Sequence, residues 1–277
     1  MSVLIQMRRA FRLARIGLHI MNGIVCGLLV FPVAGLSLRL YLQQRWSRQL
    51  LEIMAVNLQV PTLPMHSGMV ISNHVSWLDV FVISAIWPAT FVCKSEVRHW
   101  PLIGLLCANS NTLFLERGSR IAAKRIGEEL TDKILGGERV ALFPEGTTSE
   151  GAGLLPFRGA LLQAAIDAEC TVQPLAIGYR DSVGQPTTVA AYCGGTTFWQ
   201  SLCLVTAASE LSAHVDVLDV LETDEVSRRE LAQTAHTLIS RALQQNLVDA
   251  DKLKPVQDPH EESAQETGLL PLARVKV

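Results

Sequence analysis

The chain has 277 residues, which is enough for one large α/β domain or for two smaller domains. Apolar residues make up 49% of it and charged residues only 18%, against about 25% charged residues in ordinary soluble proteins, and this composition excludes a disordered or collagen-like protein. The formal net charge is −2, yet residues 1–60 carry seven arginines and a single glutamate. A basic block on an otherwise acidic chain predicts an anionic partner for the N-terminal segment, and we expect no nucleic acid partner.

Residues 16–38 form an uncharged, mostly apolar run. As a helix this run would be about 35 Å long, enough for a hydrocarbon core of about 30 Å. A single span usually has its positive charge on one side, but here arginines flank both ends, and Pro32 and Gly35 interrupt the run. A helix–break–helix hairpin in one leaflet would keep both basic ends at anionic head groups. The hairpin, the single span and a buried core helix all stay open, and residues 1–60 are predicted to be a membrane-attachment segment.

Beyond a linker near Pro61 and Pro64, apolar strands alternate with helical patterns. The alternation predicts one α/β domain over residues 61–248, with a single mixed, largely parallel sheet flanked by helices. The expected strands are residues 69–72, 90–93, 112–116, 139–143, 172–179, 189–192 and 215–220. The expected helices are residues 79–87, 102–108, 119–135, 159–168 and 224–245. Residues 249–277 are expected to form a loosely ordered tail.

Several common functional motifs are absent from the chain. It has no G-x-x-x-x-G-K, G-x-G-x-x-G, G-x-S-x-G or H-E-x-x-H segment, which argues against P-loop, dinucleotide-binding, common hydrolase and zinc protease sites. Its six cysteines are scattered without a C-x-x-C pair, which indicates a reducing compartment. Its seven histidines show no ligand-like spacing, so we expect no metal site.

His74 and Asp79 lie where a predicted strand meets a predicted helix. On a straight helix five residues would set their side chains about 140° apart. If His74 lies in the turn before the helix, the chain brings Asp79 back to Nδ1 of the imidazole. A carboxylate there would fix the tautomer and leave Nε2 free to act as a base. The alternative is a polar turn in which Asn73 or Ser76 caps the helix.

Two further segments also follow predicted apolar strands. Gly146 permits a ligand to approach the backbone closely, and the hydroxyls of Thr147, Thr148 and Ser149 suit an oxyanion. Arg117 is a candidate clamp for a phosphate or carboxylate, since its guanidinium binds such groups through two hydrogen bonds. The alternatives are an ordinary strand-to-loop turn and a surface arginine paired with a neighbouring acid.

Together these segments resemble the glycerolipid acyltransferases typified by bacterial 1-acylglycerol-3-phosphate O-acyltransferase. The family pattern H-x-x-x-x-D falls on His74 and Asp79, its arginine after an apolar strand on Arg117, and its F-P-E-G-T-x-S on residues 143–149. A later apolar strand with a proline, residues 172–176, completes the order. Residues 94–96 with 101–104, and residues 157–160, also look like family segments. The resemblance covers roughly residues 65–180.

The resemblance implies a glycerol-3-phosphate acyltransferase-like fold and no cofactor. It implies transfer of a fatty acyl group from acyl-CoA or acyl-carrier protein to a lysolipid hydroxyl, giving phosphatidic acid if the acceptor is 1-acylglycerol-3-phosphate. His74 would act as the base and Asp79 would orient it. The expected place is the inner, cytoplasmic membrane, with the catalytic domain facing the cytoplasm. The substrate-binding residues would be Asn73, Arg117, Glu145, Gly146, Thr147 and Ser149.

One position departs from the family pattern. Thr148 stands where phosphatidic-acid-forming members often carry arginine, which removes one candidate phosphate contact. A different acceptor, such as a lyso-ornithine lipid, therefore stays open. Two other hypotheses are a hydrolase that uses water in place of the lysolipid hydroxyl, and a membrane-anchored scaffold with a degenerate site.

Overall fold

A computed structural model describes residues 3–61, 68–100, 103–110, 112–116 and 118–252 of the chain. Within these residues lies one seven-stranded sheet of order β1-β7-β6-β2-β5-β3-β4. Strands β6, β2, β5, β3 and β4 run parallel, β7 is antiparallel to β6, and β1 is parallel to β7. The predicted single, mixed, largely parallel sheet is confirmed. The strands are β1 Val56–Gln59, β2 Met69–Ser72, β3 Thr90–Lys94, β4 Leu113–Leu115, β5 Val140–Leu142, β6 Val172–Arg180 and β7 Leu211–Val217.

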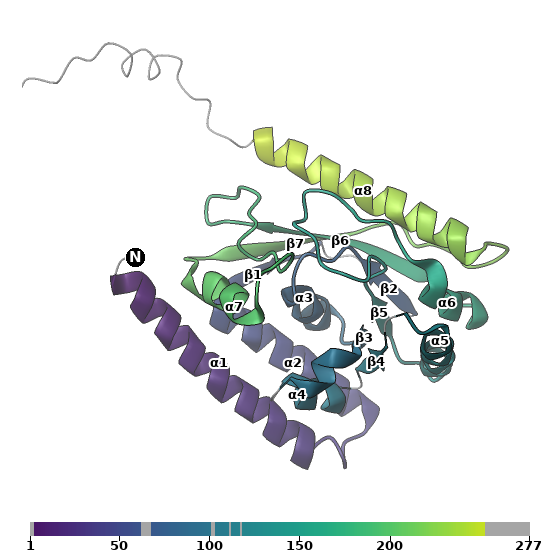
Figure 1. Ribbon diagram of the computed structural model, residues 1–277, viewed down its shortest axis with the longest axis horizontal. Coiled ribbons are helices and arrows are strands. Elements are labelled where there is room, and N and C mark those ends of the chain that lie inside the picture. The colour runs from purple at the N-terminus through teal and green to yellow at the C-terminus, as the bar shows by residue number, and fades with distance from the viewer. Residues whose placement is uncertain (1–2, 62–67, 101–102, 111, 117, 253–277) are drawn as a thin grey trace, which may run out of the picture.

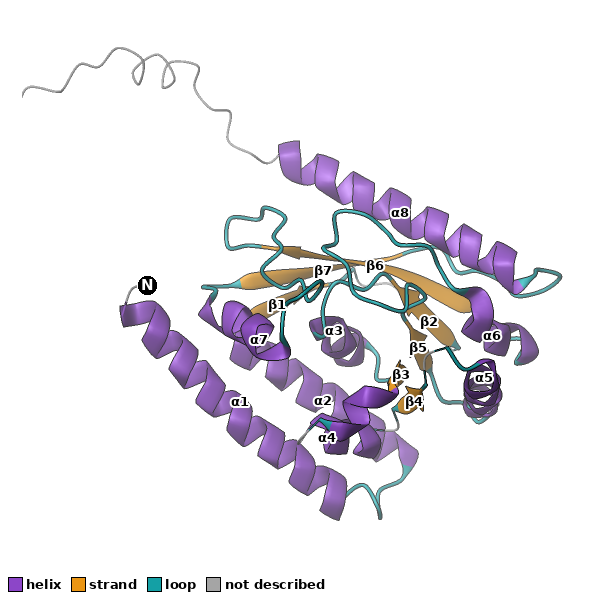
Figure 2. Cartoon of the chain, in the orientation of Figure 1, coloured by secondary structure: helices purple, strands orange, loops and turns teal. Residues whose placement is uncertain are grey.

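Helices cover both faces of this sheet (Figures 1 and 2). Helix α8 lies along one face, over β6 and β7, while α2, α3 and α7 lie on the other face and α1 lies outside them (Figure 1). The α-helices are α1 Val3–Leu29, α2 Leu36–Met54, α3 Leu78–Ile86, α4 Ile103–Asn109, α5 Arg120–Leu135, α6 Gln163–Asp167, α7 Phe198–Ala207 and α8 Arg228–Lys252. Two short 3-10 helices are η1 Ser95–His99 and η2 Gly159–Leu162.

Alternate residues of the central strands serve the two faces. In β2, Val70 packs in the cluster formed with α2, α3 and α7, while Met69 and Ile71 pack in the cluster formed with α5, α6 and α8. All four residues of β2 are buried, as expected for a parallel strand covered on both faces. Successive strand side chains point to opposite faces, so one apolar run supplies both halves of the core.

The first two helices form a hairpin whose break contains Pro32 and Gly35. The helices are joined by reciprocal bonds: Nε2 of His19 donates to the Trp46 carbonyl (2.9 Å), and the Trp46 indole N–H donates to the His19 carbonyl (3.1 Å). The two rings also stack with centroids 4.5 Å apart. Gly23 allows this approach, since a methyl group there would lie 2.7 Å from Trp46 Nε1. The segment thus has a helix–break–helix arrangement, and its entry into one leaflet stays a prediction.

Three arginines of the basic block donate hydrogen bonds to carbonyls at the C-terminal ends of α7 and α3. Arg8 donates to the carbonyl of Ala207 (2.8 Å) and Arg12 to that of Ala208 (2.6 Å), both at the C-terminal end of α7. Arg48 donates to a carbonyl in the last turn of α3 (2.8 Å). Helix C-termini carry unpaired carbonyls and negative partial charge, so arginines stabilise them. These three arginines hold α1 and α2 to the domain, and an anionic partner of the block stays a prediction.

The structure also corrects one predicted element. Residues 189–192, predicted as a strand, form a turn in which the Tyr192 N–H donates to the Val75 carbonyl (2.9 Å). The apolar character of this run has another origin, because Ala190 is buried in the core beside α3. Strand β1 and helix α7 were not predicted, and β7 begins at Leu211, ahead of the predicted start at residue 215.

The N-terminal segment and the sheet share one core. Leu50 and Met54 of α2 and Val56 of β1 are buried in the same cluster as β2 and α3, and β1 pairs with β7. Residues 50–59, assigned from the sequence to the segment 1–60, are thus packed into the predicted domain 61–248. Residues 253–277 of the predicted tail lie outside the described residues.

Candidate active site

The topology gathers three strand ends at one edge of the sheet. β2 lies between β5 and β6, and the three run parallel, so their carboxyl ends lie side by side. His74 comes two residues after β2, and Glu145 comes three residues after β5. Tyr179 is the last residue but one of β6. Ligands of parallel α/β sheets bind at this edge, so the fold brings together segments that are far apart in the sequence.

His74 and Asp79 are in contact. Nδ1 of His74 lies 2.8 Å from Oδ2 of Asp79. The residues before α3 form a turn and not a further helical turn, which closes the five-residue gap. The predicted contact is confirmed. Because the carboxylate accepts the Nδ1 hydrogen, the tautomer leaves a lone pair on Nε2. The imidazole ring is stacked on Phe143, with centroids 3.9 Å apart, and its side chain is 19% exposed.

Asp79 is fully buried and accepts four hydrogen bonds. Besides His74 Nδ1, Oδ2 accepts from the N–H groups of Val75 (2.7 Å) and Ser76 (2.9 Å). Oδ1 accepts from the hydroxyl of Tyr179 (2.6 Å). These bonds satisfy the buried carboxylate and hold its plane against the imidazole. Tyr179 was missed from the sequence; its only signal there was a tyrosine close to the end of an apolar strand.

Glu145 holds the backbone of His74. Its Oε1 accepts from the His74 N–H (2.7 Å) and its Oε2 from the Leu155 N–H (3.0 Å). Burial raises the pKa of this carboxyl, and the two N–H donors oppose the shift. From the other side, the Ser149 N–H donates to the His74 carbonyl (2.9 Å). The loop of residues 143–149 therefore fixes the position of the imidazole.

The other residues of this loop are divided between backbone contacts and a cavity. Gly146 has φ of 69°, which disfavours any other residue, and it lines the cavity together with Thr147. The Thr148 hydroxyl donates to the Tyr192 carbonyl. Glu145 and Ser149, predicted to bind substrate, are not among the described residues that line this cavity.

Asn73 and Arg117 complete the set of predicted residues. Asn73 is buried, and its amide pairs with the backbone of Ile177: Nδ2 donates to the carbonyl (2.9 Å) and Oδ1 accepts from the N–H (2.8 Å). Both ends of the amide are thus bound to β6. Arg117 lies outside the described residues, so its role stays a prediction.

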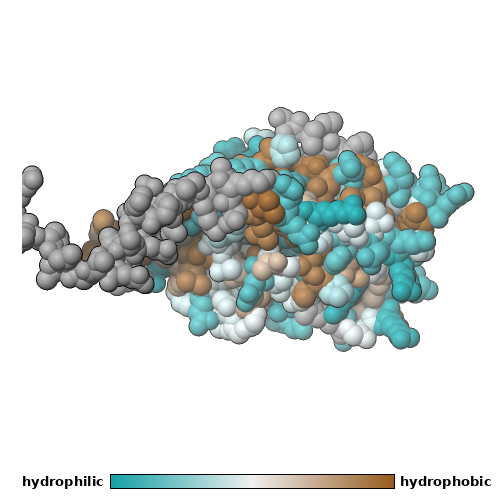
Figure 3. All heavy atoms as spheres, turned by 90° about the horizontal axis from the view of Figure 1, so that it is seen from above, coloured by the Kyte–Doolittle hydropathy of each residue, from teal (hydrophilic) through white to brown (hydrophobic). Residues whose placement is uncertain are grey.

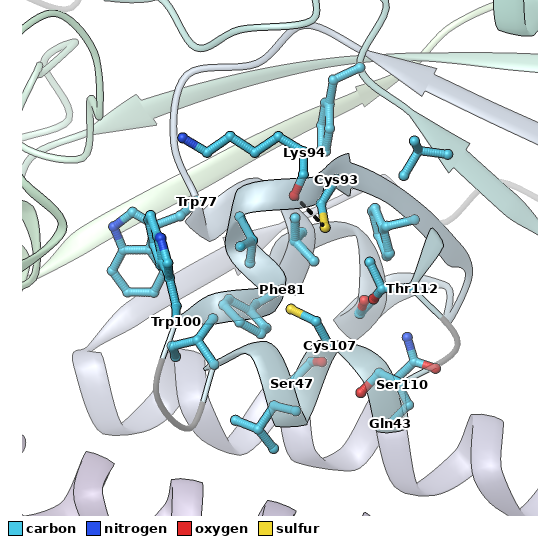
Figure 4. Close-up of a pocket in the computed structure, with 18 of the residues that line it drawn as sticks. Gln43, Ser47, Trp77, Phe81, Cys93, Lys94, Trp100, Cys107, Ser110 and Thr112 are labelled. Atoms are coloured by element: carbon cyan, nitrogen blue, oxygen red, sulfur yellow. Dashed lines mark hydrogen bonds between the residues drawn. The ribbon is translucent and has the colours of Figure 1, made fainter. Parts of the chain in front are cut away.

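A cavity of 1320 Å³ opens beside His74. It runs between the α1–α2 hairpin, α3, α4 and the ends of β3 to β5, and Figure 4 shows part of its wall. Trp77, Phe81 and Trp100 contribute aromatic surface (Figure 4). Burial raises the pKa of the Cys93 thiol to about 12 and that of the Cys107 thiol to about 11, so both remain neutral and act as small apolar groups. Polar side chains in the lower half of the view are Gln43, Ser47, Ser110 and Thr112.

Among the described residues, no three His, Cys, Asp or Glu side chains lie close enough together to hold a metal ion. The site therefore offers acid–base groups, a buried carboxylate and an apolar cavity. This set suits proton transfer to or from a substrate with a long apolar part.

Comparisons with known proteins place the chain in a family. The family model described as Acyltransferase matches residues 54–178. A Rhizobium meliloti protein named lyso-ornithine lipid O-acyltransferase is 30% identical over 84% of this chain and 87% of its own length. The chain belongs to the glycerolipid acyltransferase family. The resemblance drawn from four sequence segments is thus confirmed, and with it an enzyme family that acts on lysolipids.

Two other members of the glycerolipid acyltransferase family bear on the fold and the acceptor. A Neisseria meningitidis protein named 1-acyl-sn-glycerol-3-phosphate acyltransferase is 37% identical over 58% of this chain. The matching region spans 63% of the length of that relative. The crystal structure of the 1-acyl-sn-glycerophosphate acyltransferase PlsC from Thermotoga maritima matches 87% of this chain and 95% of its own, with a TM-score of 0.63 and 17% identity. The expected fold is therefore confirmed.

Proposed function

We propose that the protein transfers a fatty acyl group from a thioester, acyl-CoA or acyl-carrier protein, to the hydroxyl of a lysolipid. With 1-acylglycerol-3-phosphate as the acceptor the product is phosphatidic acid. The observation that carries this proposal is the His74–Asp79 pair at the wall of a large, mostly apolar cavity. An oriented imidazole is the group most often used as a general base near neutral pH.

In this mechanism Nε2 of His74 takes the proton of the acceptor hydroxyl while its oxygen attacks the thioester carbonyl carbon. The resulting oxyanion collapses, the C–S bond breaks, and the leaving thiolate takes the proton from the imidazolium. Asp79 stabilises the imidazolium between the two transfers. The oxyanion requires preorganised donors. The Gly146 N–H cannot be such a donor, because it is already bound to the Phe143 carbonyl (2.9 Å). We therefore assign donation to the oxyanion to Thr147, which lines the cavity.

The cavity is assigned to the acyl chains. Its wall contains aromatic rings, aliphatic side chains and two neutral thiols, and such a surface gains free energy when it covers a hydrocarbon chain. His74 lies on the same wall. A chain held there would place its thioester carbonyl beside the imidazole.

Helix α1 is assigned to a membrane surface. It is long and apolar enough to cross a membrane, and 22% of its most apolar window is buried. Yet α1 contacts α2 and α7 along its length, so we propose that it lies flat in the cytoplasmic leaflet of the inner membrane. On the opposite side of the molecule, polar and apolar residues are interspersed over α8 (Figure 3). The exposed apolar side chains of α1 are Val3, Leu4, Met7, Phe11, Leu18, Met21, Val25, Leu28 and Leu29.

Replacing Phe11 and Leu18 together by serine is expected to weaken binding to anionic vesicles at least tenfold. The two side chains are 64% and 74% exposed, and each would lose about 1.5–3 kcal/mol of apolar transfer energy. Flotation with vesicles measures the binding. The activity of the double variant on detergent-dispersed substrate should equal that of the wild type. Ile121→Ser on α5, where the side chain is 85% exposed, is the matched control. Undiminished flotation of the double variant would contradict the assignment.

Arg158 is proposed to bind the acidic group of the acceptor. Its backbone N–H donates to the Pro144 carbonyl (2.9 Å), and a methyl group at Gly146 would lie 3.6 Å from its Nη1. It lines the cavity on the same side as the loop that bears Thr148. Among the described residues, Arg158 forms no salt bridge. Its guanidinium can thus serve a phosphate or a carboxylate.

The variant Arg158→Gln is expected to raise the KM for the acceptor about tenfold, the value of one charge-assisted hydrogen bond, with little change in the KM for the donor. Initial rates with each substrate varied in turn measure both constants. Arg158→Lys keeps the charge, so its KM for the acceptor should lie between that of the wild type and that of Arg158→Gln. The control is Arg229→Gln on α8, outside this cavity. An unchanged acceptor KM would remove Arg158 from the site.

The decisive assay mixes the purified protein with an acyl-CoA or acyl-carrier protein and measures thiol release with and without lysolipids. Release that depends on 1-acylglycerol-3-phosphate or a lyso-ornithine lipid supports acyl transfer and identifies the acceptor. Release that is independent of any lysolipid would indicate a hydrolase. No release with any acceptor would indicate a scaffold.

A further inference from the structure

We infer that Tyr179 is a positioning residue of the reaction, whose hydroxyl fixes the Asp79 carboxylate in the orientation that serves His74. The inference rests on the proposed function, because it assigns His74 as the base. Tyr179 lies 100 residues after Asp79 in the chain, on β6, and belongs to none of the sequence segments that indicated the family. It reaches the dyad only through the fold.

The bonds on the two carboxylate oxygens are unequal. Oδ2 of Asp79 accepts from three N–H groups, those of Val75, Ser76 and the His74 ring. Oδ1 accepts from the Tyr179 hydroxyl, 2.6 Å away. Asp79 has no exposed surface and Tyr179 only 5%, so bulk water cannot replace this donor. Without the hydroxyl, Oδ1 would lose its bond and the carboxylate could turn away from the imidazole.

The sheet sets the position of this hydroxyl. β6 is paired with β2 on one side and with β7 on the other, where Tyr179 stands opposite Ala213. The Asn73 amide extends the pairing beyond β2 to Ile177. The ring of Tyr179 is packed in the same core cluster as Leu175 and Ile177. At Tyr179 itself the strand is paired with β7, and a residue on a paired strand moves less than one on a loop, so β6 acts as the fixed reference for the dyad.

The negative charge of Asp79 also strengthens the hydrogen bond that the Tyr179 hydroxyl donates. Burial and the neighbouring Asp79 charge raise the pKa of Tyr179 well above its ordinary range, so the phenol stays a donor throughout the working pH range. The titratable groups around Asp79 are His74, Tyr179 and Glu145. When the phenol is removed, the carboxylate is free to turn from the imidazole. The imidazolium then loses its opposite charge, and the acidic limb of the pH–rate profile should move to lower pH.

The test is Tyr179→Phe, which removes one oxygen and leaves the ring. We expect kcat to fall about 10–100-fold, the range of one charge-assisted hydrogen bond, while both KM values stay within about twofold. The acidic limb of the pH–rate profile should move to lower pH, because the imidazolium loses the oriented carboxylate. Tyr41→Phe, at an exposed residue of α2, should change neither quantity. An unchanged kcat together with an unchanged profile would overturn the inference.

A double-mutant cycle separates positioning from general packing. In an Asp79→Asn background the Tyr179→Phe change should lower kcat less than about threefold, because the charge that it serves is gone. An equal loss in both backgrounds would show that the tyrosine acts through the fold. If the phenylalanine variant does not fold, 4-fluorophenylalanine at residue 179, which is nearly equal in size to tyrosine and has no donor, should lower kcat by the same factor, and an unchanged kcat would overturn the inference. A fully active His74→Ala protein would instead defeat the proposed function.

Discussion

Replacing His74 by alanine is expected to lower kcat/KM for acyl transfer by about 10²–10⁴-fold, the usual contribution of a positioned general base. Nε2 is the ring nitrogen left without a hydrogen when Nδ1 donates to Asp79. Alanine offers no group that could take the hydroxyl proton of the acceptor. The residual rate would come from the donors and the cavity that hold the substrates together.

The fold should survive this change. Glu145 and Ser149 bind the backbone of residue 74 and not its ring, so those bonds remain in the variant. The ring itself is partly exposed and is stacked on Phe143, and its loss should shift the thermal midpoint only modestly. Thiol release by the purified variant is the measurement. The control is His236→Ala in α8, which removes a half-buried ring that packs edge-on against Phe157. Wild-type activity of the His74 variant would refute the mechanism.

Replacing Asp79 by asparagine is expected to lower kcat by about 10²–10⁴-fold while the protein stays folded. The amide has the shape of the carboxylate. Its oxygen can accept from Val75, Ser76 and the His74 ring, and its nitrogen can face Tyr179. What disappears is the negative charge that stabilises the imidazolium. The substrates still bind, so both KM values should change little.

Asp79→Ala supplies the contrast. Alanine leaves three buried N–H groups and one hydroxyl without their acceptor, each at about 1–3 kcal/mol. This variant should therefore unfold at much lower urea concentration than the asparagine variant, although both are inactive. Urea titration by circular dichroism measures the difference. Equal loss of stability in the two variants would show that asparagine also disrupts the turn before α3. A near-normal kcat in the Asp79→Asn variant would show that the negative charge of Asp79 is not needed for the reaction.

Much of the sheet could be predicted because its central strands are short, wholly buried and parallel. Such strands appear in the sequence as unbroken apolar runs, and the predicted strands at residues 69–72 and 172–179 match β2 and β6 closely. Helix α5 was found from its periodic apolar residues, and Ser119 does cap it, accepting from the Ala122 N–H (3.1 Å). Local pattern was sufficient for these elements.

Features that depend on distant contacts were missed. β1 is four residues long and gains its strand identity from β7, which begins at Leu211. The apolar run at residues 189–192 has a strand-like composition, but it lies over the loop after β2. Glu145 and Asn73 form their hydrogen bonds with backbone groups. Every residue has such groups, so the partners cannot be identified from the sequence. The contact of His74 with Asp79 could be foreseen because its geometry is local.

Helix α1 has the substrate cavity on one side and the outer surface of the protein on the other. One side of it, with Ile16, Ile20 and Gly23, lines the cavity beside the catalytic pair, while the row that includes Leu4, Phe11 and Leu18 points outward. A helix is about 10 Å across, so in the proposed orientation a partition one helix thick stands between the bilayer and the substrate. The hydrocarbon core of the membrane and the acyl chain in the cavity would then be separated by α1 alone. Loosening α1 at its His19–Trp46 contact would open the cavity toward the leaflet along this helix as well.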